Sequence, residues 1–207
     1  MREVSVSFLK EGNYKNYIES INNSDADYIH FDVMDGDFVS EKNLSVSDLC
    51  KYLSLSKKKN DVHLMVSNPI KYISKLSLYN IDYITIHREI KNYDKCIDMI
   101  KSFGFKVGLA INPSTDISSV FDDLDKVNLI LVMGVNPGKS GQCFIPETSS
   151  KIDELKCEII KRGLNVKVSV DGGVCDDVLD KIGNADVVVS ASYLLDDLNR
   201  IEKVKNI

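Results

Sequence analysis

The stretch LILVMGVNPGKSGQCFIPE, residues 129–147, decides the fold because it joins an apolar run, a glycine-rich turn and the start of a helix. Residues 129–135 are almost all apolar, which is typical of a strand buried on both faces of a parallel sheet. An amphipathic pattern continues over residues 147–162 and predicts a helix there. The stretch therefore predicts one complete βα unit.

The turn inside this stretch contains Gly138-Lys139-Ser140, the ending of a nucleotide-binding P-loop. That motif needs four residues between its first glycine and the Gly-Lys pair, whereas Gly134 leaves only three. Pro137 also lacks an amide N–H that such a loop would use to hold a phosphate. We therefore reject an ATP or GTP site, although glycine-rich turns bind phosphate in other folds too.

Strand and helix patterns alternate along the whole chain. We expect eight strands, at Val4–Phe8, Tyr28–Val33, Asp61–Val66, Tyr83–His87, Lys106–Ile111, Leu129–Val135, Lys167–Asp171 and Val187–Ala191. Amphipathic patterns predict helices near residues 13–23, 45–55, 68–79, 93–103, 117–124, 147–162, 174–182 and 196–205. Eight consecutive βα units without a linker predict a closed (β/α)8 TIM barrel, a single domain over residues 1–207. A doubly wound open sheet is the rival architecture.

The composition excludes several classes of partner. A net charge of −5, with no basic patch that interleaves aromatic residues, argues against nucleic acid. Five scattered cysteines without a Cys-x-x-Cys pair favour reduced thiols in a cytoplasmic protein over disulfides or a thiolate zinc site. No apolar run approaches the roughly 18 residues of a membrane span, so we expect no membrane partner. The oligomeric state is not fixed by the sequence, which leaves a homo-oligomer open.

Four chemically active side chains lie at or near the ends of predicted strands, where the active sites of barrels form. His30 and Asp32 alternate on one face of their strand, His63 lies in the next strand, and Asp171 ends the seventh. Each alone is more commonly structural: His63 as a hydrogen-bonded core residue, Asp171 as a turn cap. Together they predict a divalent metal site, because two inward carboxylates need a cation or protons to compensate their charge.

A metal held by two carboxylates suggests proton chemistry. The cation would polarise the carbonyl of an α-hydroxyketone and stabilise the enediolate that forms when the neighbouring C–H loses its proton. Asp32 and Asp171 would act as the acid and base on opposite faces, which inverts that carbon. His87 ends the fourth predicted strand without a partner in this pattern, and we interpret it as structural.

Phosphate would anchor the far end of such a substrate. Barrels commonly bind phosphate on the loops after strands seven and eight, where backbone amides supply donors. Gly172-Gly173 and Ala191-Ser192 follow those strands, and the turn at residues 138–141 arrives from strand six. Lys139 either contacts the phosphate directly or is solvated at the tip of its loop.

These residues resemble the ribulose-phosphate 3-epimerase family in order and spacing over nearly the whole chain. The motifs are SFL (7–9), ADYIHFDVMDGDFV (26–39), DVHLMV (61–66), NP (112–113), VMGVNPGKSGQCFIPE (132–147) and VDGG (170–173). The resemblance implies a ribulose-phosphate-binding barrel that interconverts D-ribulose 5-phosphate and D-xylulose 5-phosphate, with one zinc, iron, manganese or cobalt ion. It makes His30, Asp32, His63 and Asp171 the metal ligands. The implied substrate-binding residues are Ser7, His63, Gly138, Lys139, Ser140, Gly141, Asp171, Gly172, Gly173, Ala191 and Ser192.

The chain departs from the family pattern near the substrate. Lys139 and Ser140 replace an aromatic residue and a glycine, Ala191 replaces a glycine, and SEKNLSVSD (40–48) lacks the Pro-Asn and Gly-Pro of the family. If the glycine replaced by Ala191 had positive φ, the alanine would strain its loop. These departures put the substrate in question more than the reaction.

Three alternative functions remain open. A 3-epimerase for D-allulose 6-phosphate shares the same ligand runs, and the missing Gly-Pro favours it slightly. A decarboxylase or aldol-type synthase would need an Asp-x-Lys-x-x-Asp motif, but Met34 occupies the lysine position. A phosphosugar-binding module without turnover should have lost a ligand or a base, and none is missing.

Overall fold

Eight parallel strands form a closed barrel in the computed structural model, which describes residues 2–207. The strands pair in chain order, and the first pairs with the last. They are β1 (Glu3–Ser7), β2 (Tyr28–Met34), β3 (Lys59–Met65), β4 (Ile81–His87), β5 (Lys106–Ile111), β6 (Leu129–Met133), β7 (Lys167–Asp171) and β8 (Val187–Ser190). The predicted (β/α)8 barrel is confirmed, and the open-sheet rival is wrong, because β1 and β8 close the sheet.

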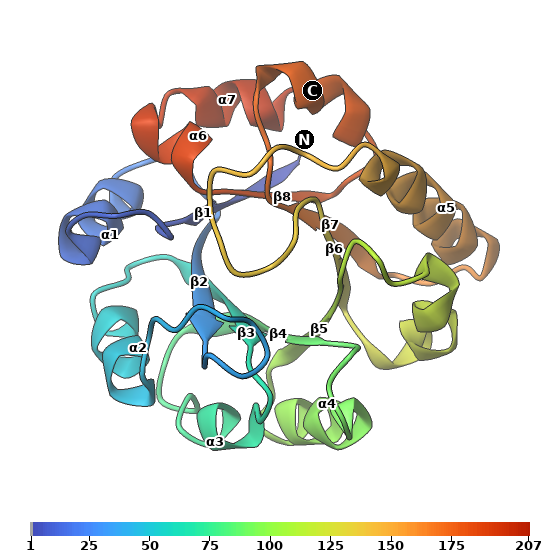
Figure 1. The fold of residues 1–207 in the computed structure, drawn as a ribbon, viewed down its shortest axis with the longest axis horizontal. Helices are drawn as coiled ribbons and strands as arrows, with labels where there is room; N and C mark the ends of the chain where they lie inside the picture. The colour runs from blue at the N-terminus through green and yellow to red at the C-terminus, as the bar shows by residue number, and fades with distance from the viewer. Residues whose placement is uncertain (1) are drawn as a thin grey trace.

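Helices surround the barrel on its outside (Figure 1). The α-helices are α1 (Tyr14–Asn22), α2 (Val46–Leu53), α3 (Ile70–Ile73), α4 (Tyr93–Ser102), α5 (Glu147–Lys161), α6 (Ser192–Asp196) and α7 (Arg200–Lys205). Two 3₁₀ helices, η1 (Ile117–Lys126) and η2 (Asp176–Ile182), replace α-helices after β5 and β7. Among residues 2–207, no helix combines the length and the apolar character that a bilayer span requires.

Strand boundaries agree with the sequence to within one or two residues, but several helices differ. The helix expected at 68–79 is only the single turn α3, and the one expected at 196–205 is shortened to α7, preceded by the separate helix α6, which ends at Asp196. Asp197 separates those two because its backbone is extended, and its carboxylate accepts a hydrogen bond from the amide of Asn199. The segment expected as an α-helix at 117–124 buries Ile117, Val120 and Asp123 at a spacing of three, which matches the 3₁₀ repeat. The helix expected at 174–182 is likewise 3₁₀.

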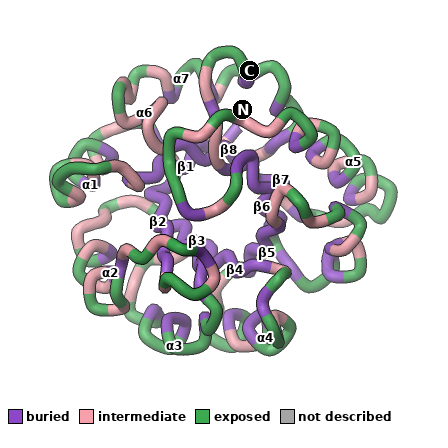
Figure 2. Tube along the Cα trace, in the orientation of Figure 1, coloured by how far each residue is buried: buried purple, intermediate pink, exposed green. Residues whose placement is uncertain are grey.

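The core has two layers, inside and outside the sheet. Figure 2 shows that buried residues follow the barrel strands, whereas the outer sides of the helices and their loops are exposed. The outer layer packs strand residues against the helices, and includes Phe31, Leu64 and Ile84, each completely buried. The inner layer fills the barrel and contains Tyr28 and Tyr83 in edge-to-face contact. Because both faces of each strand are covered, the strands are continuously apolar except where polar residues enter the interior. Those interior polar residues form the site.

Candidate metal and substrate site

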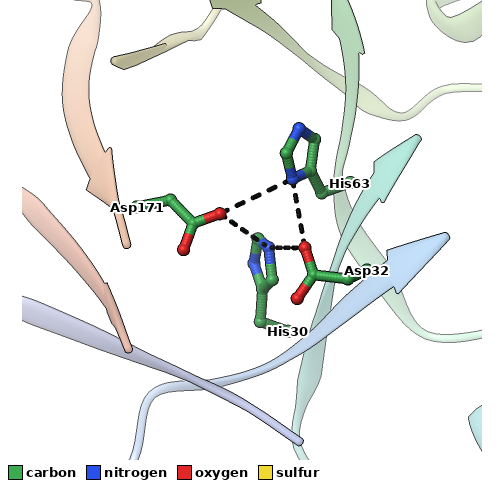
Figure 3. A group of neighbouring side chains, drawn as sticks. All are labelled: His30, Asp32, His63 and Asp171. Atoms are coloured by element: carbon green, nitrogen blue, oxygen red, sulfur yellow. Dashed lines mark hydrogen bonds and ion pairs between the residues drawn. The ribbon is translucent and has the colours of Figure 1, made fainter. Parts of the chain in front are cut away.

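Four side chains meet inside the barrel, near the carboxyl ends of three strands (Figure 3). His30 and Asp32 come from β2, His63 from β3 and Asp171 from β7. Strand pairing aligns Asp32 with His63, which brings the two neighbouring strands' side chains together. One ligand atom from each of the four residues lies within 4.8 Å of the others. The residues that the sequence predicted as ligands are therefore adjacent, and each is at most 9% exposed.

The two nitrogen atoms of the His30 ring have different surroundings. Its Nδ1 lies 2.8 Å from Oδ2 of Asp61, and that same carboxylate oxygen accepts a hydrogen bond from the Ser5 hydroxyl. Its Nε2 lies 3.3 Å from Oδ1 of Asp32 and is buried without a hydrogen-bond partner among the described residues. If Asp61 accepts the Nδ1 proton, the Nε2 lone pair faces the carboxylates. An orphaned, buried nitrogen so oriented fits a metal ligand.

His63 has the complementary arrangement. Its Nδ1 lies 3.2 Å from Oδ1 of Asp32 and 3.7 Å from Oδ2 of Asp171, while its Nε2 is on the far side of the ring (Figure 3). That Nε2 lies 2.9 Å from Nε2 of His87. His87, which the sequence left as a structural residue without a partner, therefore contacts a candidate ligand directly.

The two carboxylates have opposite electrostatic environments. Burial favours the neutral form of Asp32, but the rings of His30 and His63 outweigh it and hold the pKa of Asp32 well below its usual range. Burial and the charge of Asp32 raise the pKa of Asp171 to about 7. Burial opposes a charged His30, yet Asp61 and Asp32 raise its pKa well above the ordinary value. Without a metal, the cluster thus favours protons on His30 and Asp171, and a bound cation would take the place of that positive charge.

The chemistry of the donor set fits one divalent first-row metal. Two borderline imidazole nitrogens and two hard carboxylate oxygens form a mixed donor set that zinc, iron, manganese and cobalt all accept. The buried cluster of His30, Asp32, His63 and Asp171 is therefore consistent with a metal site. No feature of these residues selects one metal among the four.

A cavity of about 480 Å³ opens beside the two carboxylates. Its lining includes most of the residues that the sequence predicted to bind substrate: Ser7, Gly138, Lys139, Ser140, Gly141, Asp171, Gly172, Gly173, Ala191 and Ser192. His63, also expected there, is 0% exposed. The Ser7 hydroxyl donates to Oδ2 of Asp32 at 2.7 Å, so Ser7 holds that carboxylate.

Glycines allow the loops after β6 and β7 to touch at the cavity. A Cβ on Gly173, whose φ is +71°, would lie 2.5 Å from Cα of Phe144. A Cβ on Gly134 would lie 2.4 Å from the carbonyl oxygen of Gly172. The loop after β6 then crosses the mouth of the barrel in Figure 1, where Gln142 donates to two carbonyls of its own turn. Close backbone contact, which only glycine permits, shapes this end of the cavity.

The structure shows how two residues that depart from the family pattern, Ala191 and Lys139, are accommodated. Ala191 has φ −98°, so alanine causes no positive-φ strain there. The Lys139 side chain is 71% exposed and lies 3.0 Å from Glu41, which belongs to the loop after β2. The two loops thus meet beside Gly138, which lines the cavity and whose added Cβ would lie 2.8 Å from Glu41.

Sequence reasoning missed several residues around the site. Asp61 precedes His63 by two positions on the same strand face, and that spacing was the available signal for its contact with His30. Glu89 follows His87 by two positions, and its Oε2 lies 3.2 Å from Nδ1 of His87. Lys181 adds a basic side chain to the cavity lining and had no signal beyond its charge.

The fold and site together define a class: parallel (β/α)8 barrels with a buried mixed nitrogen–oxygen metal site beside a cavity. Solved structures share the fold, among them a mutant tryptophan synthase alpha-subunit from Pyrococcus furiosus with a TM-score of 0.70. It is 14% identical in sequence, and the match covers 99% of this chain and 93% of that one. A likeness at this identity shows the architecture alone.

Residues 3–195 match the model of the ribulose-phosphate 3 epimerase family, and the chain belongs to that family. It is 38% identical to the ribulose-phosphate 3-epimerase of Buchnera aphidicola over 182 residues, covering 85% of this chain and 80% of the relative. It is 34% identical to the ribulose-phosphate 3-epimerase of Methanocaldococcus jannaschii, covering 100% of this chain and 90% of the relative. The family resemblance in the sequence is confirmed.

Proposed function

We propose that this chain is a metal-dependent ribulose-phosphate 3-epimerase that interconverts D-ribulose 5-phosphate and D-xylulose 5-phosphate. The observation that carries the proposal is the pair of buried carboxylates, Asp32 and Asp171, whose pKa values are displaced in opposite directions beside a cavity. Membership of the family and relatives named ribulose-phosphate 3-epimerase support the choice of reaction. Two acids tuned apart in one site are the pattern of an acid–base pair.

Proton transfer at C3 follows from these environments. Asp32, held ionised by its histidine neighbours, would take the C3 proton of the bound ketose. Asp171, which holds a proton more readily, would return one to the opposite face of the same carbon. In the reverse direction the two roles exchange. A bound divalent metal would polarise the C2 carbonyl and stabilise the negative charge of the enediolate.

Neighbouring residues would orient the reacting groups. The Ser7 hydroxyl fixes one oxygen of Asp32 and leaves the other, Oδ1, on the side of the two histidine rings. Met65 and Met133 line the cavity near the carboxylates and would exclude water from the carbanion-like intermediate. The substrate's reacting end would lie on this apolar wall.

The phosphate would bind at the glycine-rich end of the cavity. Gly172, Gly173, Ala191 and Ser192 line it with little side-chain bulk, which lets backbone amides approach an anion. The turn at residues 138–141 completes this end, and Lys139 would add charge through solvent. Backbone donors of this kind bind phosphate without demanding a particular sugar.

A 3-epimerase for D-allulose 6-phosphate is the second candidate. The segment after β2 lacks the Pro-Asn and Gly-Pro of the family pattern, and Glu41 of that segment forms an ion pair with Lys139, which lines the cavity. A longer sugar would extend toward these residues. The reaction and the acid–base pair would be unchanged.

Side-by-side assays of the two ketose phosphates test the proposal. Chelator-treated protein, reloaded with Zn²⁺, Mn²⁺, Fe²⁺ or Co²⁺, should epimerise D-ribulose 5-phosphate with a higher kcat/KM than D-allulose 6-phosphate. Asp171→Asn should reduce kcat at least a thousandfold because an amide cannot relay a proton, whereas the exposed Asp25→Asn should leave it unchanged. A preference for the six-carbon substrate would favour the second candidate. Turnover of neither substrate would refute both.

A further inference from the structure

A chain of hydrogen bonds runs outward from His63 to the loop after β5. His63 Nε2 lies 2.9 Å from His87 Nε2, and His87 Nδ1 lies 3.2 Å from Oε2 of Glu89. The other oxygen of Glu89 accepts from the amide of Asn112 at 2.8 Å and from the hydroxyl of Thr115. Three strand ends, those of β3, β4 and β5, are thus connected behind one candidate ligand.

Packing fixes the position of the His87 ring within this chain of hydrogen bonds. His87 is 0% exposed, and its ring meets that of His63 edge to edge, with 5.0 Å between centroids and 24° between planes. Phe38 contacts it as well, with ring centroids 4.6 Å apart. Glu89 is only partly exposed, at 22% for its side chain. The rings therefore have little freedom to choose other partners.

Counting protons along the chain leaves one arrangement compatible with a metal. A metal at Nδ1 of His63 needs a lone pair there, so the proton of this neutral ring must be on Nε2. That proton must be donated to His87 Nε2, which then has to be an acceptor. A neutral His87 therefore carries its proton on Nδ1 and donates it to Glu89. The carboxylate of Glu89 acts only as an acceptor, from His87, Asn112 and Thr115, as an ionised carboxylate must.

We propose, on the basis of the metal site above, that His87 and Glu89 are positioning residues that set the tautomer of His63. Through this relay, Glu89 holds the proton of His87 on Nδ1, and His87 holds the proton of His63 on Nε2. The lone pair of His63 Nδ1 is then directed between Asp32 and Asp171 before any metal arrives. Neither His87 nor Glu89 is expected to touch the substrate.

The isosteric variant Glu89→Gln tests the relay. If its carbonyl oxygen stays with Asn112 and Thr115, its NH₂ faces His87 Nδ1 and forces the His87 proton to Nε2. His63 must then move its own proton to Nδ1, where it blocks the metal. The reversed amide would instead place NH₂ against the Asn112 N–H, which cannot accept. That reversed amide would still accept the Nδ1 proton of His87 and keep both tautomers, but it leaves the Asn112 N–H without an acceptor, which disfavours it. Thr115→Val, the matched control, removes one donor and leaves the carboxylate in place.

The measurements are Zn²⁺ affinity, by competition with a chromophoric chelator, and the tautomers of the histidines, by ¹⁵N NMR of the zinc-loaded protein. We expect Glu89→Gln to bind Zn²⁺ 10- to 100-fold more weakly than wild type, and Thr115→Val to bind within threefold of it. His87→Phe, which keeps a planar aromatic ring but cannot accept a hydrogen bond, should weaken binding similarly. In wild type, the protons should be on Nε2 of His63 and Nδ1 of His87.

Several outcomes would overturn the relay. Zinc binding within threefold of wild type by both Glu89→Gln and His87→Phe would do so, as would a proton on Nε2 of His87 in the wild-type protein. Wild-type protein that binds no zinc would overturn the relay and the metal site together. Tight zinc binding with the expected tautomers but no epimerase activity would support the relay and refute the proposed function instead. The two conclusions therefore fail on different results.

Discussion

Replacing Asp171 by Asn should make the metal-free protein relatively more stable as the pH rises. Burial and the charge of Asp32 raise the pKa of Asp171 from its ordinary 3.8 to about 7. A raised carboxyl pKa contributes stability that is fully present below the unfolded value and is lost as the pH rises through the folded value. The wild-type protein therefore loses stability as Asp171 ionises between pH 4 and 7, whereas the Asp171→Asn variant does not.

The size of this effect follows from the pKa difference. Between the two pKa values the folded state binds one proton more than the unfolded state, so the free energy of unfolding falls by about 1.4 kcal/mol per pH unit. Over the whole interval this amounts to about 4 kcal/mol for Asp171. The free energy of unfolding of Asp171→Asn, minus that of wild type, should rise by about this amount between pH 4 and pH 8. Urea denaturation of chelator-treated protein at several pH values measures it.

Asp32→Asn is the matched control because the histidines lower the pKa of Asp32 instead. A lowered carboxyl pKa contributes stability above the unfolded value, which is lost only as the pH falls below about 4. Asp32→Asn should therefore be less stable than wild type from pH 5 to 8. Because it also removes a charge that raises the pKa of Asp171, its difference from wild type should rise with pH, but by less than that of Asp171→Asn. Parallel pH profiles for wild type and Asp171→Asn would contradict the assignment of Asp171 as the carboxyl that is costly to ionise.

Three further substitutions test other parts of the site. Asp61→Asn should weaken Zn²⁺ binding 10- to 100-fold, measured by chelator competition, because the His30 ring loses its anionic partner; unchanged affinity would remove Asp61 from the account. Gly173→Ala should lower the free energy of unfolding by about 1–3 kcal/mol in urea, because its φ of +71° and the contact with Phe144 exclude a Cβ; a variant as stable as wild type would contradict the packing. Lys139→Met should raise KM by less than about tenfold with kcat unchanged, since its charge is exposed and screened; a large fall in kcat would assign Lys139 to the chemistry.

The sequence was informative wherever a residue's role depends on its own strand. Continuous apolar runs predicted the eight strands. The positions of His30, His63 and Asp171 in those strands predicted that they lie together, because parallel strands end on one face of a barrel. Helices were less predictable, since η1 and the split after α6 depend on local turns. Single residues such as Asp197 decide such turns.

Contacts between strands were the part that the sequence could not supply. His87 lies beside His63 only because β3 and β4 pair with His63 opposite Thr85, two residues before His87. Register of this kind depends on how the whole barrel closes. The role of Asp61 depends on register in the same way, because its partner His30 lies opposite it on the neighbouring strand β2.

Isotope exchange tests most directly whether Asp32 and Asp171 carry a proton to and from one carbon. Metal-reloaded protein would be incubated with D-ribulose 5-phosphate in D₂O, and substrate and product would be analysed by NMR and mass spectrometry. We predict D-xylulose 5-phosphate with a single deuterium, at C3, and loss of the product in Asp171→Asn, in which Asp32 alone can at most exchange the C3 proton of the substrate. Product without deuterium at C3, or deuterium at another carbon, would contradict proton transfer by this pair.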